Sequence, residues 1–296
     1  MRKMPAAGVC SVAVADWVAG PLQPARVLGA FRSAVHLQLA GESGPPQVVA
    51  LVTNEGVALP NAVLVSSPDG VASLASLHDG EASVGAGEVT VGALRVVARR
   101  WWNPRPQLPA TSTEALAAAF HELTGRHPVG PDEAGLDVAP RVAVLEEAVH
   151  RGDPDACVEA AGALIGLGSG LTPAGDDVVA GLLAGLRLLP TAVGEDGGRS
   201  AALADRLEAA VVPTAHLRTP ALSAALLAHA GRGEVARPVA RLLRALTGRG
   251  DSEAAARRLA NVGHTSGRDL LTGLHIAAAV VCAPPLSEGI RYDPSS

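Results

Sequence analysis

The segment Gly166-Leu-Gly-Ser-Gly-Leu-Thr-Pro-Ala-Gly-Asp-Asp-Val-Val-Ala-Gly-Leu182 leads a glycine-rich loop directly into an apolar helix. Thr172 and Pro173 follow the order expected of an N-cap residue and a first helical residue. The residues before the loop, 154–165, have helical rather than strand spacing. The glycines also lack the Gly-x-Gly-x-x-Gly spacing of a dinucleotide-binding loop. The segment therefore predicts a helix, a loop and a second helix, and it disfavours a Rossmann site.

The same pattern returns near the C-terminus, where Asn261-Val-Gly-His-Thr-Ser-Gly-Arg-Asp269 leads into a second apolar helix. The two segments align without gaps, with Gly175, Asp177, Gly181 and Leu182 on Gly267, Asp269, Gly273 and Leu274. An internal repeat of this kind indicates two structurally equivalent loops. Glycine in the middle of a helix costs about 1 kcal/mol and usually has a packing reason, so we expect the two mid-helix glycines to be helix-packing contacts.

The chain before these loops has the pattern of short strands. From Val9 to about Trp102, apolar runs such as 48–52, 62–65 and 89–98 alternate with turn residues. The predicted turns are Asn54-Glu55-Gly56, Pro68-Asp69-Gly70 and His78-Asp79-Gly80. The prolines in Trp101-Trp-Asn-Pro-Arg-Pro106 can continue neither a helix nor a central strand, and we place the tryptophans at a domain junction.

Beyond Thr111 the composition shifts to Ala, Leu, Glu and Arg with helical spacing, and Ser112 or Thr113 is placed to cap the first helix. Helices are predicted over 114–123, 138–150, 154–165, 173–189, 199–211, 220–230, 235–247, 252–261 and 267–282, with a loop at 194–198. The fold class is therefore α+β, with a β-rich N-terminal region, 1–108, followed by a compact, mainly α-helical region, 109–296.

Composition excludes several classes of function. Of the 24 basic residues only Lys3 is a lysine, so a Schiff-base lysine and a Walker A phosphate loop have no candidate in the body of the chain. The net charge is −5 and the arginines are scattered, so we expect no nucleic-acid partner. Three separated cysteines form no C-x-x-C pair, which fits a reducing cytoplasm. No apolar run reaches the length of a membrane helix, so we expect no membrane association.

The two loops have the features of an anion site. A glycine loop that ends at a helix N-terminus presents backbone N–H groups and the positive end of the helix dipole, and arginine suits carboxylate or phosphate. We expect a small anionic substrate here. The predicted substrate-binding residues are Gly168, Ser169, Gly170, Thr172, Asp176, Thr265, Ser266, Gly267, Arg268 and Arg218.

The aspartates of these loops admit several roles. A carboxylate repels an anion unless it binds a metal, takes up a proton, or holds a loop or a substrate amide by hydrogen bonds. The alternative is helix capping, since Ser266-x-x-Asp269 resembles a capping box and acidic residues suit a first helical turn. His264 and His216 can act as acid or base near neutral pH. The predicted catalytic residues are Asp177, Asp269 and His264.

Three motifs resemble those of the AllH-like proteins, which are associated with oxamate carbamoyltransferase of allantoin breakdown. They are Gly168-Ser-Gly-Leu-Thr-Pro-Ala-Gly-Asp-Asp177, Gly263-His-Thr-Ser-Gly-Arg-Asp269 and Trp102-Asn-Pro104, and the resemblance runs from about residue 50 onward. It implies phosphorolysis of an N-carbamoyl compound, in which oxalurate and phosphate give oxamate and carbamoyl phosphate, or the reverse. It also implies an oligomer with two other subunits, one FdrA-like and one AllG-like.

On this interpretation the residues from Gly168 to Thr172 and from Thr265 to Arg268 hold the anion. Asp177 and Asp269 orient the carbamoyl amide or bind a metal, for which Mg²⁺ is the candidate; no cofactor is otherwise implied. Two alternatives remain open, namely a noncatalytic assembly subunit and a freestanding enzyme that acts on another ureido, amide or carboxylate substrate.

Overall fold

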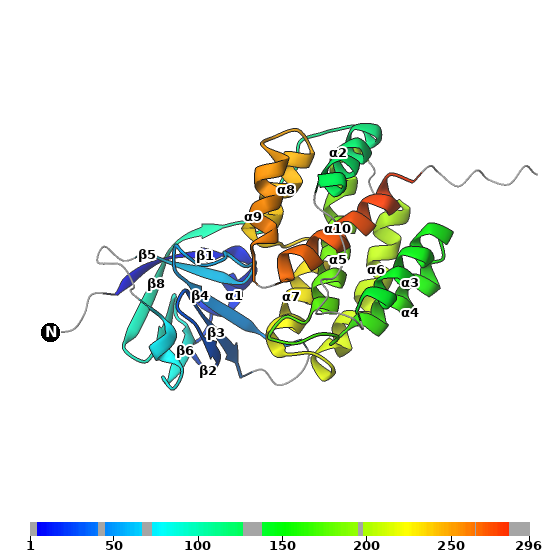
Figure 1. The fold of residues 1–296 in the computed structure, drawn as a ribbon. Helices are drawn as coiled ribbons and strands as arrows, with labels where there is room; N and C mark the ends of the chain where they lie inside the picture. The colour runs from blue at the N-terminus through cyan, green and yellow to red at the C-terminus, as the bar shows by residue number, and fades with distance from the viewer. Residues whose placement is uncertain are drawn as a thin grey trace, which may run out of the picture.

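The computed structural model describes residues 5–40, 45–66, 73–126, 138–194, 198–263 and 265–283. A β-barrel formed by the N-terminal part lies against a bundle of helices formed by the C-terminal part (Figure 1). The predicted α+β class is therefore confirmed. No helix among the described residues is long and apolar enough to span a membrane.

The barrel is a closed, eight-stranded sheet in the order β1-β5-β4-β3-β2-β6-β7-β8. Two strand pairs, β1 with β8 and β4 with β5, are parallel, and the other neighbours are antiparallel. The strands are β1 (Ala6–Ser11), β2 (Gln23–Ala30), β3 (Ala34–Leu39), β4 (Val48–Val52), β5 (Ala62–Ser66), β6 (Ala82–Gly85), β7 (Glu88–Val91) and β8 (Leu94–Trp102). The short helices η1 (Val12–Val14), α1 (Ala15–Ala19) and η2 (Ala75–Leu77) lie in the connections.

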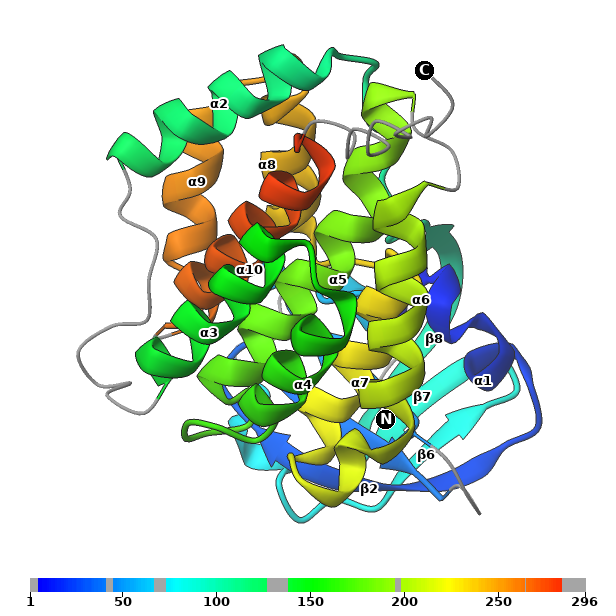
Figure 2. The same ribbon diagram turned by 90° about the vertical axis from the view of Figure 1, so that its right-hand side faces the viewer.

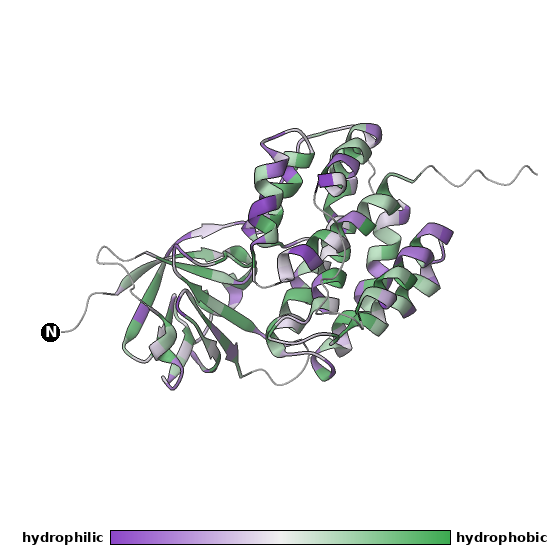
Figure 3. Ribbon diagram, viewed as in Figure 1, coloured by the Kyte–Doolittle hydropathy of each residue, from purple (hydrophilic) through white to green (hydrophobic). Residues whose placement is uncertain are grey.

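Strand β4 shows why its sequence is apolar at every position. Val49 and Leu51 belong to the core inside the barrel, whereas Val48, Ala50 and Val52 lie on the outer face. Helix α7 covers Val48, and Leu59 and Trp102 pack on the cluster of Ala50 and Val52, so all five residues are buried. A strand buried on both faces has no polar alternation, and Figure 3 shows the strands as mostly hydrophobic ribbon.

The helices are α2 (Thr113–Arg126), α3 (Val138–Arg151), α4 (Pro154–Leu164), α5 (Ala174–Val193), α6 (Arg199–Val211), α7 (Ala221–Gly231), α8 (Arg237–Leu246), α9 (Ser252–Ala260) and α10 (Ser266–Val281), with the 3₁₀ helix η4 (Val212–Leu217) before α7. All nine predicted helices are present, with boundaries within a few residues. Helices α5 and α10 run through the middle of the bundle, and the other helices surround them (Figure 2). Helix α7 packs against β4, where Leu222 and Ala225 contact Val48.

The two central helices cross in backbone contact. A Cβ atom built on Gly181 would lie 2.2 Å from the carbonyl oxygen of Leu270, and one built on Gly273 would lie 1.9 Å from that of Val178. No side chain fits at either position, which confirms the predicted packing role of both glycines. One turn further on, a Cβ on Gly185 would meet the Cβ of Ala277 at 2.4 Å. The two helices therefore run side by side with their N-termini at the same end.

Some local predictions were wrong or incomplete. Ser112 does cap α2, since its Oγ accepts a hydrogen bond from the N–H of Ala115 at 3.1 Å. Thr172, however, is not the N-cap of α5, because Pro173 takes this place with an extended backbone and no side-chain cap. The predicted single strand 89–98 is divided between β7 and β8 by a tight turn. The predicted turn at 54–56 is present, and the one at 68–70 lies outside the described residues.

Candidate functional site

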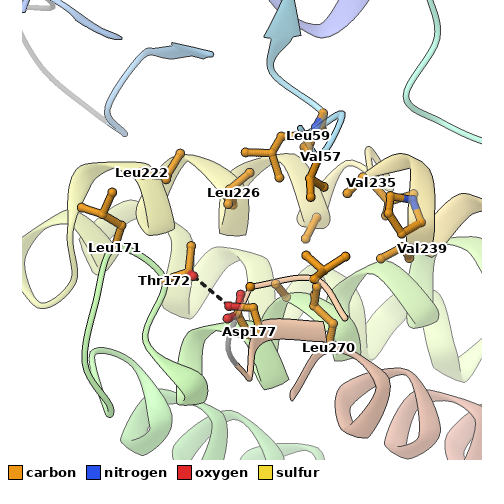
Figure 4. Close-up of a pocket in the computed structure, with 18 of the residues that line it drawn as sticks. Val57, Leu59, Leu171, Thr172, Asp177, Leu222, Leu226, Val235, Val239 and Leu270 are labelled. Atoms are coloured by element: carbon orange, nitrogen blue, oxygen red, sulfur yellow. Dashed lines mark hydrogen bonds between the residues drawn. The ribbon is translucent and has the colours of Figure 1, made fainter. Parts of the chain in front are cut away.

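A cavity of about 380 Å³ lies between the barrel and the N-terminal ends of α5 and α10. Apolar side chains from both parts of the molecule form most of its wall, among them Leu59, Leu171, Leu222 and Leu226 (Figure 4). The polar residues that line it are Ser33, His36, Thr172, Asp177, Glu234 and Ser266. A largely apolar cavity with a few convergent polar groups has the character of a small-molecule site.

The loops that precede α5 and α10 are built alike, as their sequences predict. Gly175 packs so closely on the end of α4 that a Cβ would lie 2.1 Å from the carbonyl oxygen of Leu164. Gly267 packs in the same way on α9, where a Cβ would lie 1.7 Å from the carbonyl oxygen of Leu259. The two loops bring Thr172 and Ser266 together, with their hydroxyl oxygens 3.0 Å apart.

The glycines of the first loop are required by backbone conformation. Gly166, Gly168 and Gly170 have φ values of 79°, 112° and 90°, which L side chains rarely adopt. At Gly166 a Cβ would also lie 2.3 Å from the carbonyl oxygen of Arg218. The Gly-x-Gly-x-Gly spacing is thus explained by the path of the chain and needs no ligand.

The sequence predicts free backbone N–H groups at these helix starts, but those of residues 175–177 and 267–269 are already hydrogen-bonded. The N–H of Gly175 donates to the carbonyl of Leu167 at 2.9 Å, and those of Asp176 and Asp177 donate to the carbonyl of Pro173. At the start of α10, residues 267–269 donate to carbonyls of their own loop in the same manner. The side chains of Thr172, Asp177 and Ser266, together with the two helix dipoles, therefore provide the polar character of this end of the cavity.

Asp177 is the most unusual of these groups. Its side chain lies beneath the apolar wall and points toward Thr172 (Figure 4), and the residue is only 6% exposed. Its Oδ2 atom has no hydrogen-bond partner among the described residues. Burial raises its pKa well above the ordinary value, and repulsion from Asp269 and Asp176 acts in the same direction. Hydrogen bonds from Ser266 and Thr172 only partly oppose this rise. Asp177 is thus predisposed to hold a proton and to donate a hydrogen bond.

Its neighbour Asp176 is engaged within the chain. One carboxylate oxygen accepts the N–H of Gly166 at 2.7 Å, and the other accepts the hydroxyl groups of Thr219 and Ser223, the latter at 2.6 Å. Asp176 therefore ties the glycine loop to the start of α7. It does not line the cavity.

Of the remaining predicted residues, those that the structure describes do not line the cavity. Asp269 is 1% exposed and acts on Asp177 through its charge, but it does not line the cavity. Arg218 holds the end of α4, because its guanidinium donates to the carbonyl oxygens of Gly162 and Ile165 at 2.8 and 3.2 Å. The cavity wall also does not include Gly168, Ser169, Gly170, Thr265, Gly267 or Arg268. His264 lies outside the described residues.

The structure adds His36 to the site, and the sequence analysis missed it. His36 lies in β3, is 6% exposed, and its Nδ1 atom has no hydrogen-bond partner among the described residues. Burial lowers its pKa from 6.5 to about 4, so the imidazole is neutral at physiological pH. Phe31 contacts its ring edge-on. The one available signal was a histidine between two apolar residues, Val35 and Leu37.

Within the described ranges, no group of three or more His, Cys, Asp and Glu side chains is arranged to hold a metal ion. The predicted Mg²⁺ remains an untested prediction. The raised pKa of Asp177 makes this carboxyl a better hydrogen-bond donor than a metal ligand, because a metal ligand must be deprotonated.

Comparison with known proteins agrees with the resemblance of the two glycine-loop motifs, but the match does not extend to Trp102-Asn-Pro104 or to the rest of the chain before residue 164. No curated protein matches the chain, and no solved structure matches it. Residues 164–278 match a family model described as oxamate carbamoyltransferase subunit AllH. This segment holds both glycine loops, the whole of α5 and most of α10. Over residues 164–278 the chain is AllH-like.

Proposed function

We propose that this protein is a subunit of a carbamoyltransferase of the oxamate type, and that the cavity at the N-terminal ends of α5 and α10 binds the substrate that carries the carbamoyl group. The matched segment contributes Thr172, Asp177 and Ser266, which are the polar residues of these two helix starts in the cavity wall. The description of the matching family supports the assignment as a carbamoyltransferase subunit. The cavity supports the binding of a small ligand.

The observation that carries the proposal is the buried Asp177 carboxyl with an oxygen that lacks a partner. A carboxylic acid that stays neutral in an apolar site can donate a hydrogen bond to a carbonyl oxygen as that oxygen gains negative charge. A carbamoyl group has such an oxygen. The nearby charge of Asp269 helps to keep the proton on Asp177.

In the proposed reaction an oxygen of phosphate attacks the ureido carbon of oxalurate. The bond from this carbon to the nitrogen of the oxamate moiety breaks, and the nitrogen takes up a proton. Carbamoyl phosphate and oxamate are the products, and the reverse direction uses the same contacts. Asp177 donates to the carbonyl oxygen, and the hydroxyl groups of Thr172 and Ser266 orient the planar carbamoyl group.

A second candidate is a freestanding enzyme that acts on a larger ureido or amide substrate with an apolar side chain. The apolar wall of the cavity favours it, because oxalurate has no apolar group that could contact Leu171, Leu226 and Val239. A test with the chain alone separates the two candidates, since the freestanding enzyme needs no partner.

The decisive experiment measures carbamoyl phosphate formed from oxalurate and phosphate by the chain alone, and by the chain with FdrA-like and AllG-like subunits. Asp177→Ala, which removes the hydrogen-bond donor, is compared with Asp16→Ala, which makes the same chemical change at an exposed residue of α1. We expect activity in the complete assembly, a loss of about 10²- to 10³-fold in kcat for Asp177→Ala, and no loss for Asp16→Ala. Full activity of Asp177→Ala, with unchanged folding, contradicts the role of Asp177. Equal activity of the partners without this chain indicates a noncatalytic subunit.

A further inference from the structure

A second pocket, of about 300 Å³, lies where the barrel's last strand leads into the helices. Its wall consists of Trp102, Asn103, Pro104, Pro106, Arg237, Ala240, Arg241 and Arg244. It shares no lining residue with the cavity at Asp177, although Ala236 and Pro238, on either side of Arg237, belong to that cavity. The Trp102-Asn-Pro104 motif, which the proposed reaction does not use, thus forms one wall of a separate pocket.

Three arginines supply the charge of this pocket. Arg237, Arg241 and Arg244 are spaced along α8 so that they share one face of the helix. Among the described residues none of the three forms an ion pair with a carboxylate, and the pocket wall contains no acidic residue. The pocket therefore concentrates positive charge that the described part of the chain does not neutralise.

The surroundings of Arg237 disfavour its positive charge. It occupies the first turn of α8, where the positive end of the helix dipole disfavours a cation. Burial and repulsion by Arg241 lower its pKa below the ordinary value. A bound anion would relieve both effects.

Contacts within the chain hold Arg237 and Trp102 in place at the pocket. The guanidinium carbon of Arg237 lies 5.0 Å from the centroid of the Trp102 ring, a cation–π contact that restricts where this side chain can lie. The backbone on both sides is pinned, since Arg237 donates its N–H to the carbonyl of Ala58 and Val235 donates to that of Pro104. The indole N–H of Trp102 is buried without an acceptor among the described residues. Donors that are fixed in advance lose little entropy when they bind.

We propose that the pocket formed by Trp102–Pro106 and the arginine face of α8 binds a small oxyanion of the phosphate class, as free phosphate or as the phosphoryl group of a larger ligand. A pocket of about 300 Å³, lined by Trp102, Pro104 and Pro106 as well as the arginines, favours a small ligand over an acidic protein segment. Arginine forks match the oxygens of a phosphoryl group in pairs. This proposal does not depend on the carbamoyl reaction.

The test is a titration of the full chain with inorganic phosphate by isothermal calorimetry, at an ionic strength held constant with sodium chloride. The double variant R241Q/R244Q removes two of the pocket's charges. The matched control R249Q/R258Q removes two charges from exposed residues outside the pocket wall. Circular dichroism and thermal melting establish that both variants are folded.

We expect saturable binding to the unmodified chain, a rise in Kd of at least about tenfold in R241Q/R244Q, and a Kd within about twofold of the unmodified value in the control. Absence of phosphate binding overturns the proposal, and so does an equal loss in the two variants, which would mark non-specific charge attraction. A deca-glutamate peptide serves as a second probe. Binding of this peptide without binding of phosphate, with dependence on Arg241 and Arg244, would overturn the small-ligand assignment in favour of an acidic partner surface.

Discussion

Asp176 and Asp177 are neighbours in the first turn of α5, yet one carboxyl group is saturated with hydrogen bonds and the other has an oxygen without a partner among the described residues. Successive helical residues point in directions about 100° apart, so the two side chains enter different surroundings. Asp176 meets donors from the glycine loop, from Thr219 and from α7, and Asp177 meets the apolar cavity. The pair therefore separates a structural carboxylate from a candidate functional one.

Asp176→Asn should lower the free energy of unfolding by about 2–4 kcal/mol. The amide group places an N–H₂ where the carboxylate accepted hydrogen bonds, and hydrogen bonds to a charged group contribute about 1.5–3 kcal/mol each. Urea unfolding at pH 7 measures the change. Asp177→Asn is the contrast and should not lower the free energy of unfolding at pH 7, because the unfolded aspartate gains stability by ionising and the asparagine does not. Equal effects of the two substitutions would contradict the distinction.

The pH dependence of stability should report the proton on Asp177. Its folded-state pKa is raised, so the folded chain binds this proton more tightly than the unfolded chain. The resulting stability is fully present below the unfolded pKa of about 3.8 and is lost as the pH rises through the folded pKa. In Asp177→Asn this loss is absent. The difference in unfolding free energy, variant minus unmodified chain, should therefore increase from about pH 4 upward, by up to about 1.4 kcal/mol per pH unit. A difference that does not vary with pH would show that the carboxyl has an ordinary pKa.

The contribution of His36 to stability should change with pH in the opposite direction to that of Asp177. Its pKa is lowered to about 4 by burial, so its contribution is present above the unfolded value of 6.5 and is lost as the pH falls toward 4. NMR titration of the ring should show a neutral imidazole down to about pH 4. His36→Gln identifies the resonance and should remove this part of the acid destabilisation. A ring that titrates near 6.5 would mean that water reaches it freely.

Gly273→Ala should destabilise the fold by about 2 kcal/mol or more, because the new methyl group meets backbone atoms of α5 and forces the two central helices apart. Gly162→Ala in α4 is the matched control. A Cβ at Gly162 meets no atom within 4 Å, so its better helix propensity should stabilise the protein by about 0.5–1 kcal/mol. Thermal and urea unfolding compare the two variants. The helix contact would be in doubt if both alanines were tolerated equally.

The helices could be predicted closely because their signals are local. Periodic apolar residues and capping side chains lie within each segment, and the predicted range 199–211 coincides with α6. The closed barrel could not be predicted in the same way. Its closure depends on the parallel pairing of β1 with β8, whose partners are far apart in the chain. Short-range patterns contain no information on such pairing.

The candidate site was predicted in part for a related reason. Asp177, Thr172 and Ser266 lie in the repeated motif and line the cavity together. The motif could not show that Thr172 contacts Ser266 instead of capping its own helix, since the distance between the loops is set by the glycine crossing of α5 and α10. His36 belongs to the other part of the molecule, and its surroundings are formed by residues distant in sequence.

The reciprocal contacts of α5 and α10 have a consequence for ligand recognition. Gly181 meets Leu270, and Gly273 meets Val178, with the same spacing along the chain between equivalent residues. Equivalent residues of the two helices therefore contact each other reciprocally. The equivalence ends at the first helical residue, where α5 has Ala174 and α10 has Ser266. Ser266 lines the cavity and Ala174 does not, so a ligand would meet a hydroxyl group from the first residue of α10 and none from the first residue of α5.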